Sequence, residues 1–315
     1  MNPELLAKLA AWDAAGFLIG ENEDAEAFLH RMEETAGVNA EFEEELAKGE
    51  PVTVFDQFEV SADRRISPEL ADEAAEITDR LYGFRASHVP GFYLTREIGA
   101  LWGGCLIGDP DARFAVFLLR DAFRRHRRFL NYRRDELLAH ELCHSVRHVM
   151  NEPVLEEYFA YRTSPSALRR YLGNCFISDR DAWLFLIPVM LLPAAELVRA
   201  LWLPGFPSWI FWLTAAVYPV YLLCRNALSR RLPERARRVL TAAGVAKPDA
   251  VLFRCTLPEL SEIAGADPGA IAAMVDAKAA GSLRWQVMRA RFFSAEGMPE
   301  EPAGAPERKE EDETR

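Results

Sequence analysis

Two spacings of apolar residues divide the first 150 positions into helices and strands. Where apolar side chains recur every three or four positions, an amphipathic helix is predicted. Such helices cover residues 5–18, 25–36 and 67–84. Alternating or short apolar runs between turn residues predict strands over residues 51–60, 91–95, 101–108 and 113–120. A further helix begins near residue 134, so this part of the chain predicts an α+β fold.

A different pattern begins at residue 182. Residues 182–195 and 200–224 carry no charge, and the second run exceeds the ~20 residues that cross a bilayer core. The first run reaches a similar length if Glu196 and Arg199 lie near one interface. Residues 204–208, PGFPS, suit a tight turn between the runs. The pattern predicts a two-helix transmembrane hairpin over residues 182–224. The alternative is a hydrophobic hairpin inside a soluble fold or at an oligomer interface.

The charges beside these runs predict a topology. Arginines flank the runs on both sides, at Arg169, Arg170, Arg180, Arg225, Arg230, Arg231, Arg235, Arg237 and Arg238. The turn between the runs has no lysine or arginine. Because positively charged flanks stay on the cytoplasmic side, both ends of the hairpin are expected in the cytoplasm. The five cysteines form no CxxC pair, which fits the same reducing compartment.

Residues after the hairpin return to a soluble composition. Two short helices with a glycine-containing turn are expected within residues 257–283, a pattern that a helix-turn-helix shares with many small helical domains. We therefore expect four parts: a domain over residues 1–180 with an acidic helical N-terminal region, the hairpin, a small helical domain over 229–295, and a disordered tail over 296–315. The net charge of -11 argues against nucleic acid as a partner.

The segment HELCH, residues 140–144, has the spacing of a zinc site. Positions four apart share one face of an α-helix, so the imidazoles of His140 and His144 can reach one ion. The carboxylate of Glu141 lies near the same ion without binding it, and it can accept a proton from an activated water. The alternative is a helix that merely exposes its histidines.

A catalytic zinc site needs a third protein ligand and an open position for water. Glu156 and Glu157 stand at the start of the next predicted helix, close enough in sequence to fold back over the histidines. His148 continues the histidine stripe, but a fourth protein ligand would close the water position, so a supporting or surface role is expected for it. Cys143 faces away from the stripe and is expected in the core.

Three further segments bear on a substrate site. The run over residues 113–120 lies upstream of the HELCH helix, where such an enzyme needs an edge strand to hold an extended peptide. Gly103 and Gly104 indicate a close backbone approach or a bent strand. Residues 120–134, RDAFRRHRRFLNYRR, are strongly basic and could bind an anionic surface or lipid headgroups, or form a solvated face.

HELCH followed by EEYFAY resembles the gluzincin branch of the zinc metallopeptidases. In that branch the third ligand is a glutamate on a second helix, often in a Glu-x-x-Ala motif, and the matching positions are Glu157 and Ala160. The resemblance covers about residues 90–165 and implies a zincin-like fold with Zn²⁺ bound by His140, His144 and Glu157, with Glu156 as the competing third ligand. Tyr161 stands where the CAAX-processing and heat-shock types have aspartate, so no narrower family is assigned.

The resemblance and the chemistry together imply roles for the residues around the metal. Glu141 would be the general base that activates water and later protonates the leaving amine. Tyr158 or Tyr161 could donate a hydrogen bond to the oxyanion, and Arg162 could hold Glu157.

These features predict a membrane-anchored zinc metallopeptidase that hydrolyses peptide or protein substrates on the cytoplasmic side. One alternative is a non-catalytic zinc-binding membrane protein of the same fold, acting as a sensor or scaffold. The other is a membrane-tethered regulator whose C-terminal helices bind DNA or a protein, which the acidic composition disfavours.

Overall fold

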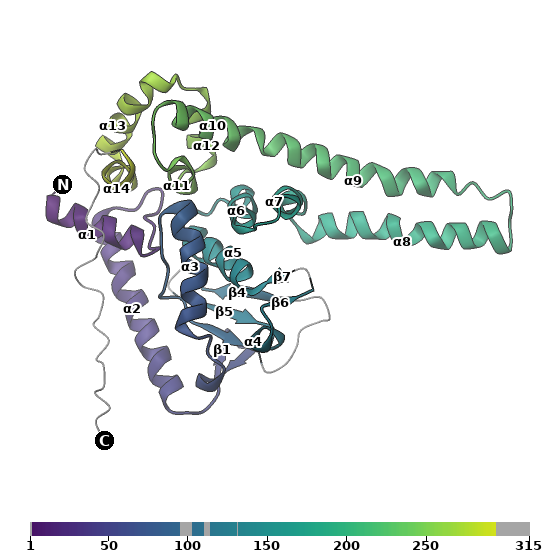
Figure 1. Cartoon of the computed structure of the whole chain (residues 1–315), viewed down its shortest axis with the longest axis horizontal. Helices are drawn as coiled ribbons and strands as arrows, with labels where there is room; N and C mark the ends of the chain where they lie inside the picture. Colours follow the sequence, from purple (N-terminus) through teal and green to yellow (C-terminus); the bar gives the residue numbers. More distant parts are fainter. Residues whose placement is uncertain (1, 95–102, 110–113, 131, 294–315) are drawn as a thin grey trace.

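A mostly helical body contains a small sheet, and two long helices project from it (Figure 1). The structure is a computed structural model of the 315-residue chain and describes residues 2–94, 103–109, 114–130 and 132–293. The expected tail over 296–315 lies outside the described residues. The mixture of helices with a minor sheet confirms the α+β class.

The first helices begin and end at the signals that the sequence carries. They are α1 (Pro3–Ala14), α2 (Ala25–Ala47) and α3 (Pro68–Tyr82), with the 3₁₀ turn η1 (Ala62–Arg64). The side chain of Asp24 accepts a hydrogen bond from the backbone N–H of Ala27 and so caps α2. α3 starts at Pro68 and stops at Gly83, whose φ of 67° is the left-handed conformation that glycine adopts most easily. The three predicted helices are thus confirmed, although α1 ends at Ala14, before the predicted residue 18, and α2 continues to Ala47, beyond the predicted residue 36.

The strands form one three-stranded sheet and two short hairpins. The hairpins are β1 (Val52–Val54) with β2 (Phe58–Val60) and β6 (Arg128–Phe129) with β7 (Tyr132–Arg133). The sheet contains β3 (Gly91–Tyr93), β4 (Gly104–Gly108) and β5 (Ala115–Leu119) in the order β3-β5-β4. β3 runs parallel to β5, and β4 runs antiparallel to it. The single strand expected over 51–60 is instead a hairpin that turns at Phe55 and Asp56, both of which have positive φ.

The prediction that residues 113–120 form an edge strand is wrong. β5 is the central strand of the sheet, and four of its five residues are buried. Its continuous apolar run is typical of a strand covered on both faces. β4 lies at the edge instead, next to the histidine-bearing helix. Gly104 lets β4 approach β5, since a Cβ there would lie 2.6 Å from the Leu119 side chain.

The middle and C-terminal helices complete the body. The middle group is α4 (Ala122–Arg125), α5 (Arg134–Arg147), η2 (His148–Met150), α6 (Pro153–Ala160), η3 (Tyr161–Thr163), α7 (Ala167–Leu172) and η4 (Gly173–Cys175). The last group is α10 (Arg231–Ala242), α11 (Pro248–Phe253), α12 (Leu257–Gly265), η5 (Pro268–Ala270), α13 (Ile271–Gly281) and α14 (Leu283–Phe292). α12 and α13 correspond to the two helices expected within 257–283.

The C-terminal helices share one hydrophobic core with α5 and α6. The ring of Tyr82 in α3 stacks on Phe253 in α11, with centroids 4.3 Å apart. The Tyr82 hydroxyl donates a 2.7 Å hydrogen bond to the carbonyl of Phe159 in α6. The sequence segments before and after the projecting helices are therefore packed against each other through buried aromatic rings.

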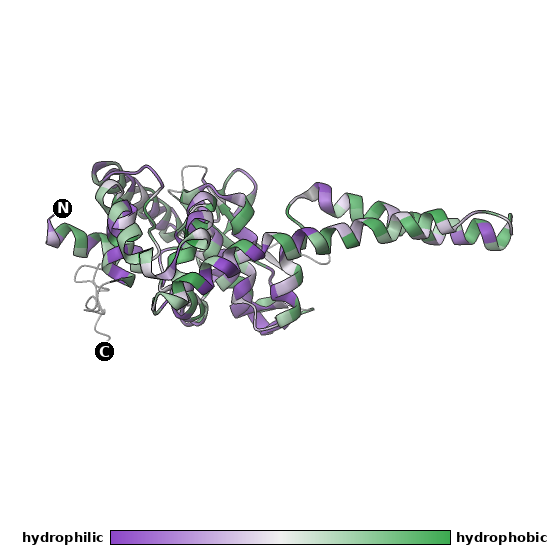
Figure 2. Ribbon diagram, turned by 90° about the horizontal axis from the view of Figure 1, so that it is seen from above, coloured by the Kyte–Doolittle hydropathy of each residue, from purple (hydrophilic) through white to green (hydrophobic). Residues whose placement is uncertain are grey.

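The projecting pair consists of α8 (Asp179–Leu201) and α9 (Trp209–Ser229), which run side by side away from the body (Figures 1 and 2). Among the described helices, the stretch Arg180–Leu201 is long and apolar enough to cross a membrane, with a mean hydropathy of 1.9. At the base of the pair, Asp181 accepts hydrogen bonds from Arg225 at 2.7 Å and from the Tyr218 hydroxyl at 2.8 Å.

Candidate metal centre

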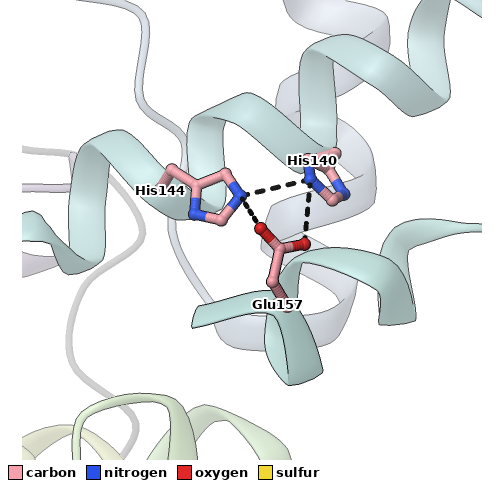
Figure 3. Close-up of side chains that lie close together, drawn as sticks. All are labelled: His140, His144 and Glu157. Carbon is pink, nitrogen blue, oxygen red and sulfur yellow. Dashed lines mark hydrogen bonds and ion pairs between the residues drawn. The ribbon is translucent and has the colours of Figure 1, made fainter. Parts of the chain in front are cut away.

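α5 brings His140 and His144 to one face of a helix, one turn apart. Their Nε2 atoms lie 3.1 Å from each other and point to the same space (Figure 3). Leu138 and Leu142 are buried on the other side and hold the helix in the core. The four-residue spacing thus places both imidazoles as the sequence predicts.

Glu157 reaches the same space from α6. The chain reverses at Asn151, which has a φ of 49°, and α6 begins at Pro153, so α6 folds back along α5. One carboxylate oxygen of Glu157 lies 3.5 Å from His144 Nε2 and the other lies 3.7 Å from His140 Nε2 (Figure 3). One ligand atom from each of the three side chains lies within 4.8 Å of the other two.

The three side chains fit a zinc ion. Zinc binds imidazole nitrogen at about 2.0–2.1 Å and carboxylate oxygen at about 2.0–2.2 Å in a tetrahedron, which separates neighbouring ligand atoms by about 3.3 Å. The two Nε2 atoms lie 3.1 Å apart, close to that value, and each faces a different carboxylate oxygen of Glu157, at 3.5 Å from His144 and 3.7 Å from His140. Two imidazoles and one carboxylate also leave the fourth position of a tetrahedron open to water.

Glu156 lies on the other side of His144. Its carboxylate contacts His144 Nδ1 at 3.3 Å and accepts a hydrogen bond from Arg147 Nε at 3.1 Å. A carboxylate on the second ring nitrogen fixes the tautomer and the orientation of a metal-binding histidine. The geometry therefore places Glu157 at the ligand position and Glu156 behind the ring.

Arg147 was not singled out by the sequence. Its side chain is fully buried, with the guanidinium over the ring of Phe159 at 4.8 Å and hydrogen-bonded to the carbonyl of Phe253 in α11. It thereby links Glu156, and through it His144, to the C-terminal helices. The only signal in the sequence is its position one turn after His144, on the same helix.

The pKa values of the two imidazoles are shifted in opposite directions. Burial, reinforced by His144 and Arg169, lowers the pKa of His140 to about 3, so its ring is neutral at pH 7. Burial alone would lower the pKa of His144 too, but the hydrogen bond that its ring donates to Glu156 and the charges of Glu157 and Glu141 raise it. His140 also hydrogen-bonds the backbone of Ala160, the small residue of the Glu-x-x-Ala motif.

Glu141 lies next to the histidines and against the edge strand. Its carboxylate accepts a 3.0 Å hydrogen bond from the backbone N–H of Leu106 in β4. Burial raises the pKa of Glu141 to about 7, against the opposing effects of His144 and this hydrogen bond. A carboxyl group with such a pKa can both accept and release a proton near neutral pH.

A cavity of about 300 Å³ opens beside His140 and Glu141. Tyr161 lines it, and its ring packs against His140 with centroids 4.6 Å apart. The hydroxyl of Tyr158 instead accepts a hydrogen bond from Arg162. Of the two tyrosines considered for the oxyanion, Tyr161 is therefore the one at the cavity.

The remaining candidates lie elsewhere. Arg162 binds Asp249 in α11 at 2.8 Å, so the suggested contact with Glu157 is replaced by one with the C-terminal helices. His148 is exposed and is not part of the group formed by the three ligands. Cys143 is fully buried, which confirms its expected place in the core.

Comparisons of the chain with protein-family models, with curated proteins and with solved structures gave no match. The geometry of the site is therefore the basis for a functional proposal.

Proposed function

We propose that the chain is a membrane-anchored zinc metallopeptidase. The observation that carries the proposal is the convergence of His140, His144 and Glu157 on one point, with the buried carboxyl group of Glu141 beside them and an edge strand alongside. This combination would provide a metal site, a general base and a place for an extended peptide, all of which peptide hydrolysis requires.

β4 offers the place for the substrate backbone. Because the N–H of Leu106 is directed to Glu141 and not to β5, the backbone groups of alternate residues in β4 lie on its free edge. A substrate in extended conformation can pair with this edge, as in other cases of strand addition. Its scissile carbonyl would then lie over the metal ligands.

The chemistry is hydrolysis of the amide bond. A zinc ion held by the three ligands would polarise the scissile carbonyl and lower the pKa of a bound water to about 7. Glu141 takes a proton from the attacking water as the new C–O bond forms. It then donates that proton to the leaving nitrogen as the C–N bond breaks. Tyr161, which lines the cavity and packs against His140, would donate a hydrogen bond to the oxyanion.

The α8–α9 pair is proposed to be the membrane anchor. The two helices expose apolar side chains along their length, including Trp183, Ile187, Trp209 and Val217. With arginines at the base of the pair and none in the turn, both ends are expected on the cytoplasmic side. Accessibility of the N- and C-termini to protease in sealed vesicles would test this orientation.

The metal content of the purified protein tests the proposal. The wild type is expected to bind about one zinc per chain. His144→Ala and Glu157→Ala are each expected to lose it. Glu141→Gln should keep the zinc and abolish hydrolysis of a peptide library. Zinc that survives Glu157→Ala would contradict the ligand set. Hydrolysis that survives Glu141→Gln would contradict the mechanism. Zinc without hydrolysis in the wild type would favour a sensor or scaffold.

A further inference from the structure

The exposed apolar surface of the described residues begins before α8. Apart from Leu130 and Val154, every exposed large apolar side chain lies between Leu168 and Leu228. Most belong to α8 and α9, but five precede them in α7 and in the segment that follows it: Leu168, Tyr171, Leu172, Phe176 and Ile177. The apolar surface of the helix pair therefore continues onto the body.

A basic and apolar segment, residues 124–130, lies beside α7. Arg124 and Arg125 in α4, Arg127 after it and Arg128 in β6 are all exposed, and Leu130, 62% exposed, follows β6. The guanidinium of Arg169 in α7 stacks over the ring of Tyr132 in β7 at 4.7 Å, which holds the two elements together. Figure 1 shows α7 and the β6–β7 hairpin on the side of the body from which α8 and α9 project.

The length of α8 sets the position of this apolar surface relative to the bilayer. Its 23 residues extend about 34 Å, close to the hydrocarbon thickness of about 30 Å. A spanning α8 therefore starts at the headgroup boundary. α7 stays near that boundary because the base of α9 holds it. Asn226 donates a 2.6 Å hydrogen bond to the carbonyl of Tyr171, and Arg230 donates one of 2.8 Å to that of Arg170.

We propose that α7 and residues 124–130 form a contact surface for anionic lipid headgroups. Apolar side chains that insert shallowly, next to exposed arginines, are the composition of an interfacial element. A bilayer is favoured over a soluble partner because this surface is continuous with the apolar surface of the α8–α9 pair.

The contact surface also forms part of the substrate cavity. Arg169 from α7 and Tyr132 from β7 line the cavity beside His140 and Glu141, and Arg169 forms an ion pair with Glu136 on α5. Lipid contact would thus hold the cavity at headgroup level. The next step rests on the proposed peptidase function. A peptidase whose cavity lies at headgroup level would cleave the membrane-proximal segment of a membrane-bound protein.

Hydrogen exchange of the full-length protein in nanodiscs tests the lipid contact. The protein is placed in phosphatidylcholine alone and in phosphatidylcholine mixed with phosphatidylglycerol, and amide exchange is followed by mass spectrometry. Exchange across residues 124–134 and 167–177 is expected to slow several-fold in the anionic membrane. High salt should reverse this effect, because it screens exposed charges. Equal exchange in both membranes would overturn the proposal.

Charge variants identify the contact. The double variant Arg125→Glu with Arg128→Glu should largely abolish the slowing of exchange that anionic lipid causes. Arg125→Gln with Arg128→Gln should lower it less and guards against misfolding of β6. Lys8→Glu with Lys48→Glu, on α1 and after α2, is the matched control and should change nothing. Protection that depends on protein concentration and not on lipid would indicate a second copy and contradict the proposal. Zinc content measured on the same samples shows separately whether the metal centre is intact.

Discussion

Glu156 and Glu157 are neighbours in the chain, but they contact opposite nitrogens of the same imidazole. Glu157 faces His144 Nε2, whereas Glu156 faces Nδ1 and is held there by Arg147. On a helix, adjacent positions point about 100° apart, so only one of the two carboxylates can reach the space between the histidines. The sequence motif favours Glu157 as the carboxylate between the histidines, but only the distances distinguish it from Glu156.

Replacement of Glu156 by Gln should weaken zinc binding by about 10–100-fold without abolishing it, because the charge that orients His144 is lost while the ligands remain. Competition with a chromophoric chelator measures the affinity. Glu152→Gln, at the start of α6 and outside the metal group, is the control. If Glu156→Gln loses zinc as completely as Glu157→Ala, Glu156 is itself a ligand.

His88 should make the stability of the folded chain sensitive to acid. Burial lowers its pKa to about 4, below the ordinary 6.5, despite a hydrogen bond with the backbone of Ala15. The unfolded chain therefore takes up the proton first. Above pH 6.5 the group has no effect, and as the pH falls from about 6.5 to about 4 stability is lost, by about 1–2 kcal/mol at pH 5.

Thermal unfolding in detergent at pH 7 and pH 5 measures this loss. His88→Phe keeps a ring against Phe17, whose centroid lies 3.9 Å away, and has no titrating group. The variant should lose less stability than the wild type between the two pH values. The same pH dependence in both proteins would exclude His88 as the cause.

The edge strand β4 depends on the absence of a side chain at Gly104. A Cβ there would lie 2.6 Å from the Leu119 side chain and 2.9 Å from the carbonyl oxygen of Leu118. Gly108, in the same strand, has only ordinary contacts of 3.5 Å or more. The two glycines therefore allow a matched comparison.

Gly104→Ala should lower the free energy of unfolding by about 1–3 kcal/mol, because β4 must move away from β5. Since β4 contacts Glu141 through Leu106, peptide hydrolysis should fall as well. Gly108→Ala should be close to neutral in both measurements. Equal effects of the two substitutions, in thermal unfolding and peptidase assays, would show that the close approach at Gly104 does not matter.

The sequence predicts where helices and strands lie better than it predicts which strands are neighbours in the sheet. The helix predicted over 67–84 has a proline near its start and a glycine at its end, and the structure agrees within two residues. The strand over 113–120 was also recognised, but its place in the sheet was not. Apolar periodicity reports how buried a strand is, whereas strand order depends on pairing between distant segments.

At the scale of the whole molecule, the two ends of the chain are joined by buried charges. Arg254, fully buried, binds the carboxylate of Asp13 at 2.7 Å and donates to the carbonyl of Tyr82. These partners lie 241 and 172 positions away, so no local pattern could reveal them. Burial raises the pKa of Asp13, but Arg254 and Arg291 outweigh it and hold the pKa below its usual value.

Arg254→Met should destabilise the body by about 3–5 kcal/mol, because it removes partners from a buried carboxylate and two buried carbonyls. Zinc content should fall in parallel, since the neighbouring Phe253 carbonyl holds Arg147. The exposed Arg235→Met is the control and should change stability by less than about 0.5 kcal/mol. Unchanged zinc content of Arg254→Met would show that the C-terminal helices do not support the candidate metal centre.

The joint at Asp181 has a consequence for how a membrane-anchored body would select its cleavage position. Arg225 and Tyr218 of α9 donate to this carboxylate of α8, and Arg225 also donates to the carbonyl of Cys175 in η4, so these hydrogen bonds tie the helix pair together and connect it stiffly to the body. A stiff connection would set a constant height of the metal above the bilayer. In such a protein, the number of residues between the bilayer and a peptide bond would determine which bond is cleaved more than the side chains beside that bond.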